Sequence, residues 1–222
     1  MQYFILCFEI MGTIAFALSG AMTGLKKNMD LFGTCILGIT TAVGGGVIRD
    51  LILGITPPTA FLNPRYILVA MGVSICVFIP QVRRILSSSR KLYENTAFLA
   101  DSAGLGIFTV FGVEVARISG YADNFFLVIF VAVVTGVGGG VMRDIFAGDK
   151  PHIFVKHIYA CAAIVGAIVC QLLCEVTSLD VSMAAGFAVI VVIRILSAKY
   201  RLNLPHAEEF RYVDDKRGGQ IS

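Results

Sequence analysis

Two Arg-Asp pairs, Arg49-Asp50 and Arg143-Asp144, are the residues of this chain whose type and setting most suggest chemistry, because each lies within an apolar stretch. Arginine or aspartate at the centre of a membrane-spanning helix costs about 2.5–3.5 kcal/mol, and less toward the helix ends. Charged side chains in a membrane-spanning helix therefore pair with other polar groups or face water. They act there as structural braces, as gates or as the lining of an ion pathway, and the sequence leaves these roles open.

Helix geometry restricts the partner of each arginine. Adjacent residues of a helix project about 100° apart and do not face each other. We therefore expect Arg49 to meet a carboxylate of another helix rather than its neighbour Asp50. The available carboxylates are those of Asp144, Glu9, Asp101 and Glu114.

A run of three glycines stands just before each pair: Gly44, Gly45 and Gly46 in the first case, Gly138, Gly139 and Gly140 in the second. Glycine in a helix interior costs roughly 1 kcal/mol relative to alanine, so six of them need a reason. A kink, a close helix contact, or backbone carbonyls facing a polar cavity would each supply one. The sequence alone does not choose among these three.

The two motifs belong to an internal repeat. Residues 41–50 read TAVGGGVIRD and residues 135–144 read TGVGGGVMRD, with the same residue at all but two positions. The correspondence extends outward to several further pairs, which are Glu9 with Asp101, Gly12 with Gly104, Gly54 with Gly148, Pro57 with Pro151 and Tyr66 with Tyr159. The repeating unit covers three apolar segments, and an odd number of crossings forces the second copy to be inverted in the membrane.

The elements that position these residues are long apolar segments. The chain has 222 residues, of which 57% are hydrophobic and only 15% are charged, whereas soluble domains have about 25% charged residues. A membrane-spanning helix needs about 20 predominantly apolar residues. We predict an all-α polytopic membrane protein with seven transmembrane helices. They cover residues 3–25, 31–53, 66–85, 96–118, 124–147, 154–174 and 181–198.

These helices form one predicted membrane domain over residues 1–200. It consists of a first repeat at about 3–88, a second repeat at about 96–175 and a seventh helix at about 181–198, followed by a cytoplasmic tail at 201–222. Basic residues such as Lys26 and Arg83 gather after odd-numbered segments, and the opposite side holds only Arg65 and Arg117. The positive-inside rule then predicts an external N-terminus and a cytoplasmic C-terminus in the cell (inner) membrane.

Other polar residues receive simpler interpretations. Ser19 is a possible lining residue of a pathway, although serine in such helices usually bonds to the backbone. Arg194, late in the seventh segment, is expected to extend to the cytoplasmic interface, and His152 is expected to be an ordinary loop residue. No clustered histidines, CxxC pair, phosphate loop or nucleophile motif is present, so we expect no metal site, no cofactor, no nucleic acid and no enzymatic activity.

With its two Gly-Gly-Gly-Val-X-Arg-Asp motifs one repeat apart and a further helix after them, the chain resembles prokaryotic members of the trimeric intracellular cation channel (TRIC) family. It is equally similar to bacterial proteins described by a glycine-transporter domain. The resemblance covers about residues 3–200. It implies a homotrimer, a separate pore in each protomer, kinks at both glycine triplets, and passage of monovalent cations, chiefly potassium.

Our leading hypothesis is therefore a potassium channel of the cell membrane that contacts membrane lipids. In it, Glu9, Asp50, Asp101 and Asp144 favour cations, while Arg49 and Arg143 hold a constriction or brace the kinks. The alternative is a secondary transporter of glycine or a similarly small amino acid, because inverted repeats also suit alternating access.

Overall fold

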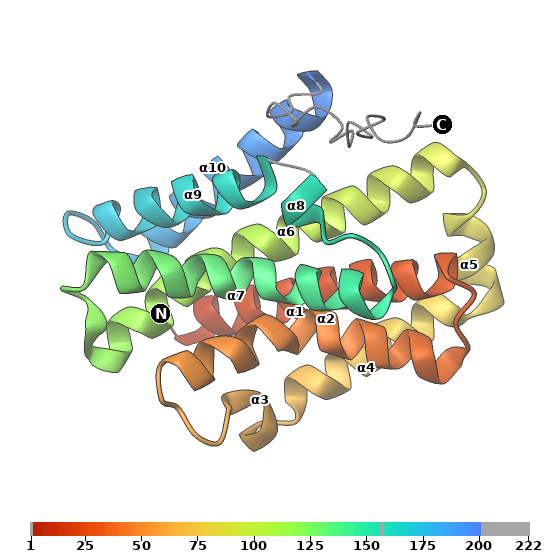
Figure 1. Cartoon of the computed structure of the whole chain (residues 1–222), viewed down its shortest axis with the longest axis horizontal. Coiled ribbons are helices and arrows are strands. Elements are labelled where there is room, and N and C mark those ends of the chain that lie inside the picture. The colour runs from red at the N-terminus through yellow and green to blue at the C-terminus, as the bar shows by residue number, and fades with distance from the viewer. Residues whose placement is uncertain (1, 156–157, 201–222) are drawn as a thin grey trace, which may run out of the picture.

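The computed structural model describes residues 2–155 and 158–200, and its regular elements there are helices (Figure 1). The predicted tail at 201–222 lies outside the described residues. The helices are α1 (Gln2–Lys26), α2 (Leu31–Ile52), α3 (Thr59–Leu62), α4 (Arg65–Phe78), α5 (Pro80–Leu86), α6 (Arg90–Ala116), the π-helical turn η1 (Arg117–Tyr121), α7 (Phe125–Phe146), α8 (His152–Val155), α9 (Ile158–Leu173) and α10 (Leu179–Tyr200).

Five of these helices, α1, α2, α6, α7 and α10, are long and apolar enough to cross a membrane. Helices α4 and α5 together make a sixth candidate, although a bend of 76° separates them. Helix α9 lies in the sixth predicted segment and has 16 residues, short of the roughly 20 that span a bilayer at right angles. The described residues thus give five or six candidate spans, against the seven that the sequence predicts.

The predicted span at 66–85 is not one straight helix. Helix α4 ends at Phe78, and α5 begins at Pro80. Between them Ile79 has an extended ψ of 131°. A proline lacks the N–H that would continue the helix and pushes the residue before it out of the helical region, so the break follows from Pro80.

Helices α2 and α7 begin and end alike. The side chain of Asp30 accepts a hydrogen bond from Gly33 N–H at the start of α2, and Asn124 accepts one from Leu127 N–H at the start of α7. Just beyond the ends of the two helices, Gly54 and Gly148 adopt φ values of 73° and 70°, which glycine tolerates best. These matched caps place each Arg-Asp pair in the last turn of its helix.

The glycine triplets lie where α2 and α7 touch. A Cβ atom at Gly45 would overlap the carbonyl oxygen of Thr135, and one at Gly139 would overlap that of Thr41. Both helices remain α-helical through the triplets, and they run antiparallel in Figure 1. Of the three reasons for the glycines, close helix contact is therefore the one that the structure supports.

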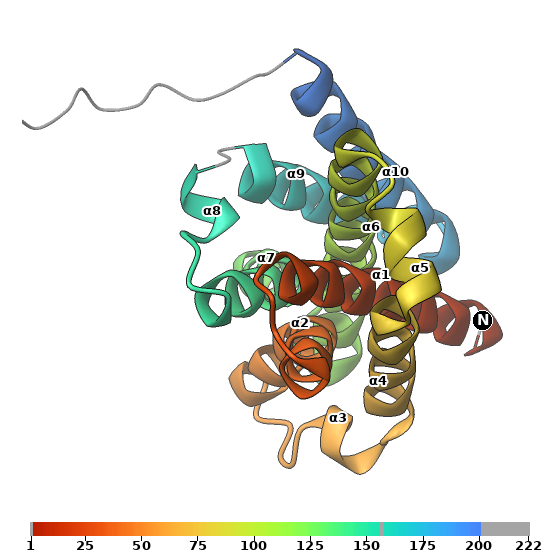
Figure 2. The same ribbon diagram turned by 90° about the vertical axis from the view of Figure 1, so that its right-hand side faces the viewer.

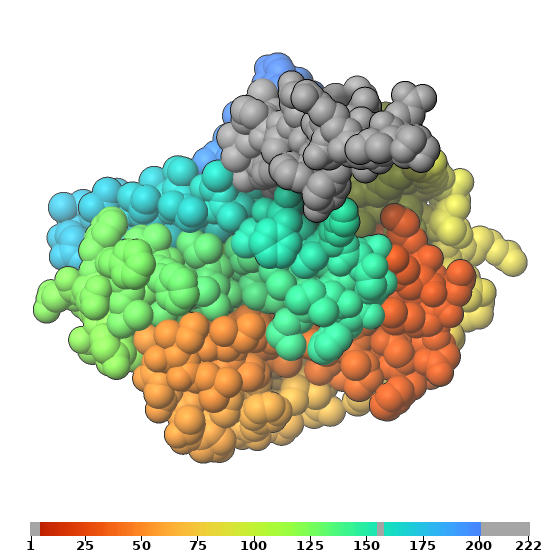
Figure 3. Space-filling model, in the orientation of Figure 1, coloured from red at the N-terminus to blue at the C-terminus, as the bar shows by residue number. Residues whose placement is uncertain are grey.

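The remaining helices surround this pair. Helices α1 and α6 pack against each other, with α4 beside α1 and α2, and α9 and α10 on the other side beside α6 and α7 (Figure 2). The rings of Phe16 from α1 and Phe108 from α6 stack with centroids 5.3 Å apart in the core. In Figure 3 the α7–α8 segment lies beside the turn between α1 and α2, where Lys27 pairs with Asp149.

Candidate ion pathway

Polar side chains gather in two places, one near the end of α2 and one near the end of α7. The first cluster consists of Glu9, Arg49, Asp50, Thr59 and Tyr66. The second cluster consists of Ser19, Asp101, Arg143, Asp144, His152, Tyr159 and Arg194. Because α2 and α7 run antiparallel, the clusters lie toward opposite ends of the molecule.

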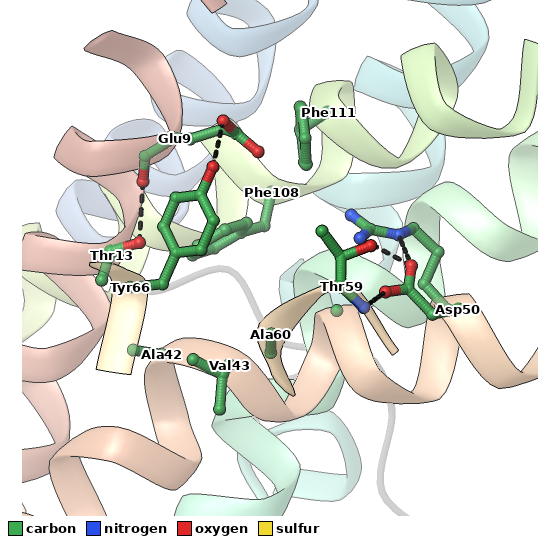
Figure 4. Close-up of a pocket in the computed structure, with 12 residues that line it drawn as sticks. Glu9, Thr13, Ala42, Val43, Asp50, Thr59, Ala60, Tyr66, Phe108 and Phe111 are labelled. Carbon is green, nitrogen blue, oxygen red and sulfur yellow. Dashed lines mark hydrogen bonds and ion pairs between the residues drawn. The ribbon is translucent and has the colours of Figure 1, made fainter. Parts of the chain in front are cut away.

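In the first cluster, Arg49 pairs with its own neighbour (Figure 4). Its Nε lies 2.8 Å and its Nη2 2.7 Å from Asp50 Oδ1. Asp50 Oδ2 accepts a hydrogen bond of 2.8 Å from the backbone N–H of Thr59, at the start of α3. The expectation that Arg49 avoids Asp50 was wrong. The Thr59 amide holds the carboxylate beside the end of α2, and the long arginine side chain curves back to reach it.

Glu9 also departs from the sequence-based expectation of a brace to arginine. Its Oε2 accepts a hydrogen bond of 2.6 Å from the hydroxyl of Tyr66 on α4. Within the part of the chain that the structure describes, no lysine or arginine makes an ion pair with Glu9. The guanidinium of Arg49 instead lies over the ring of Phe111, 5.1 Å from its centroid. Glu9 and Arg49 nevertheless line one small cavity of about 40 Å³.

In the second cluster, Arg143 contacts four side chains, those of Ser19, Asp101, Asp144 and His152. It is only 2% exposed. Its Nη1 lies 2.6 Å from Asp101 Oδ1 and 2.6 Å from Ser19 Oγ, and its Nε lies 2.9 Å from Asp144 Oδ1. Here the expected carboxylate from another helix is present, because Asp101 comes from α6. Arg143 therefore ties α7 to both α1 and α6.

The two clusters share a framework. Asp144 Oδ2 accepts a hydrogen bond of 2.8 Å from the backbone N–H of His152 at the start of α8, as Asp50 does from Thr59 at the start of α3. The hydroxyl of Tyr159 lies 3.4 Å from Asp101, in the place that Tyr66 takes beside Glu9. The repeated Tyr pair was the sequence signal that could have placed both tyrosines in the site.

Two residues of the second cluster were assigned other roles from the sequence. The Nδ1 of His152 lies 3.2 Å from Arg143 Nη2, so this histidine is not an ordinary loop residue. Arg194 does not extend to an interface. It is 4% exposed, and its Nη2 lies 3.3 Å from Asp101 Oδ2. The sequence could not show the rotation of α10 that turns Arg194 inward.

The second cluster faces a cavity of about 340 Å³. Ser19, Asp101, Arg143 and Asp144 all line it, together with His152 and Arg194. Glu114, the other carboxylate considered from the sequence, lies in neither cluster. It is 5% exposed, and its Oε2 has no hydrogen-bond partner among the described residues.

Comparison with known proteins identifies the family. The profile of a family described as "Glycine transporter" matches residues 6–81 and 98–175, which fall within the two predicted repeats. A solved structure that describes conductance through TRIC cation channels is 35% identical, covers 93% of this chain and 98% of its own, and superposes with a TM-score of 0.81. This chain belongs to the TRIC family. The sequence-based resemblance is therefore confirmed.

Further TRIC structures agree with this assignment. A crystal structure of a prokaryotic TRIC channel in 0.5 M KCl is 32% identical, covers 92% of this chain and all of its own, and gives a TM-score of 0.83. A TRIC orthologue from Rhodobacter sphaeroides is 32% identical over 89% of this chain and 98% of its own, with a TM-score of 0.78. The matched structures are channels, and the chain, as a TRIC-family protein, is not an enzyme.

Curated relatives of this TRIC-family chain are named as membrane proteins. The UPF0126 membrane protein of Deinococcus radiodurans is 34% identical over 89% of both chains. The UPF0126 inner membrane protein YadS of Escherichia coli K12 is 34% identical over 89% of this chain and 93% of its own. The chain is therefore a membrane protein, as its composition predicts.

Proposed function

We propose that this chain is a cation channel of the cell membrane that conducts monovalent cations, chiefly potassium, through a pore within each protomer. One observation carries the proposal: two cavities lined by carboxylates and arginines lie at opposite ends of the antiparallel α2–α7 pair. The similarity to solved cation channels supports it. Homotrimerisation is part of the same proposal, supported by the similarity to a trimeric intracellular cation channel.

The proposed path runs from one cavity to the other between α1, α2, α6 and α7. Its middle is closed in this conformation by two features. Gly45 and Gly139 bring the backbones of α2 and α7 into contact, and Phe16 stacks on Phe108. Conduction then requires these groups to separate, since the buried rings leave little room for a hydrated ion.

The carboxylates and the arginines have different roles in this proposal. Glu9, Asp50, Asp101 and Asp144 favour cations, because carboxylates in a cavity with low-dielectric walls concentrate counter-ions. Arg49 and Arg143 hold the ends of α2 and α7 in place and restrict the path. Ser19 and the glycine triplets shape it, with Ser19 also bonded to Arg143 in the closed conformation.

The membrane arrangement is also proposed. The matched order of α1 to α4 and α6 to α9 supports an inverted 3+3 repeat, with α10 as a seventh crossing. The basic loops support an N-terminus outside and a C-terminus in the cytoplasm. In that orientation, the first cluster faces the exterior and the second cluster faces the cytoplasm.

The direct test is potassium flux into liposomes that contain the purified protein, followed by single-channel recording. We expect flux from the wild type and a change of at least several-fold for Arg143→Ala, which frees Ser19 and leaves Asp101 with Arg194 and Tyr159 as its partners. Absence of flux from both proteins would contradict the proposal. Saturable uptake of labelled glycine that depends on an ion gradient would favour the transporter alternative instead.

A further inference from the structure

Helix α10 stands outside the internal repeat, yet it contributes a buried charge to the second cluster. Arg194 lies two thirds of the way along this helix. Its Nε lies 3.2 Å from Ser102 Oγ, and its Nη2 lies 3.3 Å from Asp101 Oδ2. A buried guanidinium with two such partners is a specific arrangement, because an arginine near a helix end would otherwise extend to water.

Two aromatic rings enclose the same guanidinium. The Cζ atom of Arg194 lies 4.9 Å from the ring centroid of Phe98 and 4.7 Å from that of Tyr159. The faces of aromatic rings attract cations, so both rings favour the charged side chain at this position. Tyr159 also contacts Asp101, which places the ring, the aspartate and the arginine in a single network.

Arg194 makes the two clusters electrically different. The first cluster holds one arginine, Arg49, and two carboxylates: Asp50 pairs with Arg49, and Glu9 accepts a hydrogen bond from the hydroxyl of Tyr66. In the second cluster, Arg143 and Arg194 face the carboxylates of Asp101 and Asp144. The repeated residues by themselves would leave one carboxylate in excess in both clusters. The arginine from α10 removes that excess from the second.

We propose that Arg194 is a specificity-determining residue that offsets part of the charge of Asp101 and so weakens the attraction of the second cavity for a monovalent cation. This inference rests on the proposed cation channel. Without Arg194, the carboxylate of Asp101 would draw cations into the cavity of about 340 Å³ that it lines. Helix α10, through this one side chain, sets the cation affinity of one end of the pathway.

Single-channel recording of Arg194→Gln tests the inference. We expect the potassium conductance at low salt to rise about 2- to 10-fold, because an uncancelled carboxylate raises the local cation concentration. The increase shrinks toward onefold at about 1 M KCl, where the Debye length is only about 3 Å. The potassium-to-chloride permeability ratio rises in the same variant.

Matched variants separate charge from packing. Arg194→Lys keeps the charge and is expected to retain wild-type conductance, whereas Arg194→Met keeps the apolar stem and is expected to behave like Arg194→Gln. Lys199→Gln removes a charge five residues further along α10 and is expected to change nothing. Adding Asp101→Asn to Arg194→Gln removes the unmasked carboxylate and is expected to reverse the gain.

The outcomes are distinguishable from a failure of the proposed function. If the wild type conducts potassium and both neutral variants match it in conductance and selectivity, the inference is overturned while the channel remains. If neither neutral variant assembles as judged by size-exclusion chromatography, Arg194 is a structural brace and the inference is likewise overturned. If the wild type does not conduct, the proposed function itself fails, and this inference fails with it.

Discussion

The buried charged residues of this protein differ mainly in how many hydrogen bonds and ion pairs each one makes. Asp144 accepts hydrogen bonds from Arg143 and from the His152 amide, so its buried carboxylate is well satisfied. Glu114 is almost as deeply buried, yet one of its oxygens has no partner among the described residues. A buried charge without a partner destabilises the folded state, whereas a fully bonded one does not. The two carboxylates should therefore respond oppositely to neutralisation.

We predict that Glu114→Gln leaves the protein at least as stable as the wild type, with a gain of up to about 1 kcal/mol. Glutamine has nearly the same shape, and it removes the cost of burying a charge. Asp144→Asn breaks an ion pair of 2.8 Å and is expected to cost about 3–5 kcal/mol.

Thermal unfolding of the two variants in detergent measures this contrast. Glu175→Gln, at an exposed partner of Arg117, serves as a control that changes stability by less than about 1 kcal/mol. A clear destabilisation by Glu114→Gln would show that the carboxylate has a partner that the described residues do not supply.

At the scale of elements, the decisive contact is that between α2 and α7. The two helices approach so closely that the carbonyl groups of Thr41 and Thr135 occupy the space of missing side chains. The contact is reciprocal, since each triplet supplies the middle glycine and each helix supplies the threonine. Small residues at such crossings let helix backbones touch, and this contact sets the distance between the two charged clusters.

We predict that Gly45→Ala and Gly139→Ala each destabilise the protein by about 1–3 kcal/mol, because the added methyl group meets a backbone carbonyl that cannot move aside. Gly72→Ala on α4 is the matched control. Nothing lies within 4 Å of its added Cβ, so helix propensity should make it neutral or stabilising by up to about 1 kcal/mol.

Unfolding in detergent and potassium flux are both measured for these three variants. If the triplets serve only flexibility, the Gly45 and Gly139 variants would keep wild-type stability and lose flux alone. That result would contradict the packing role of the glycines.

For the whole molecule, charge distribution and repeat order together predict the orientation. The short helices α3 and α8 follow α2 and α7 in the same way, and the two clusters lie toward opposite ends. In the proposed inverted arrangement one cluster meets the exterior and the other meets the cytoplasm. In the same proposal, Lys26 and Lys27 at the turn between α1 and α2 lie on the cytoplasmic side.

We predict that a single cysteine at Lys27, in a variant with the six native cysteines replaced, is labelled by a membrane-impermeant maleimide only after the cytoplasmic side is exposed. A cysteine at Thr59, on α3, should be labelled in intact spheroplasts. The two positions provide controls for each other. Labelling of both from one side would contradict the inverted repeat.

Sequence by itself determined the class of protein, the family and the doubled Gly-Gly-Gly-Val-X-Arg-Asp motif. These features follow from composition and from the repeated motif, whereas the Asp30 and Asn124 caps and the break at Pro80 became apparent only in the structure. The length of α9 and the number of crossings were less secure, because apolar runs do not mark helix ends.

Only the tertiary structure decided which side chains meet. It turned Arg194 inward to Asp101, brought His152 to Arg143 and left Glu9 with Tyr66. It also showed that the glycine triplets lie at a close contact between α2 and α7. Each of these depends on how a helix is rotated and how near it lies to its neighbours. The repeat in the sequence fixes neither quantity, because α10 has no counterpart in it and the two arginines reach different partners from equivalent positions.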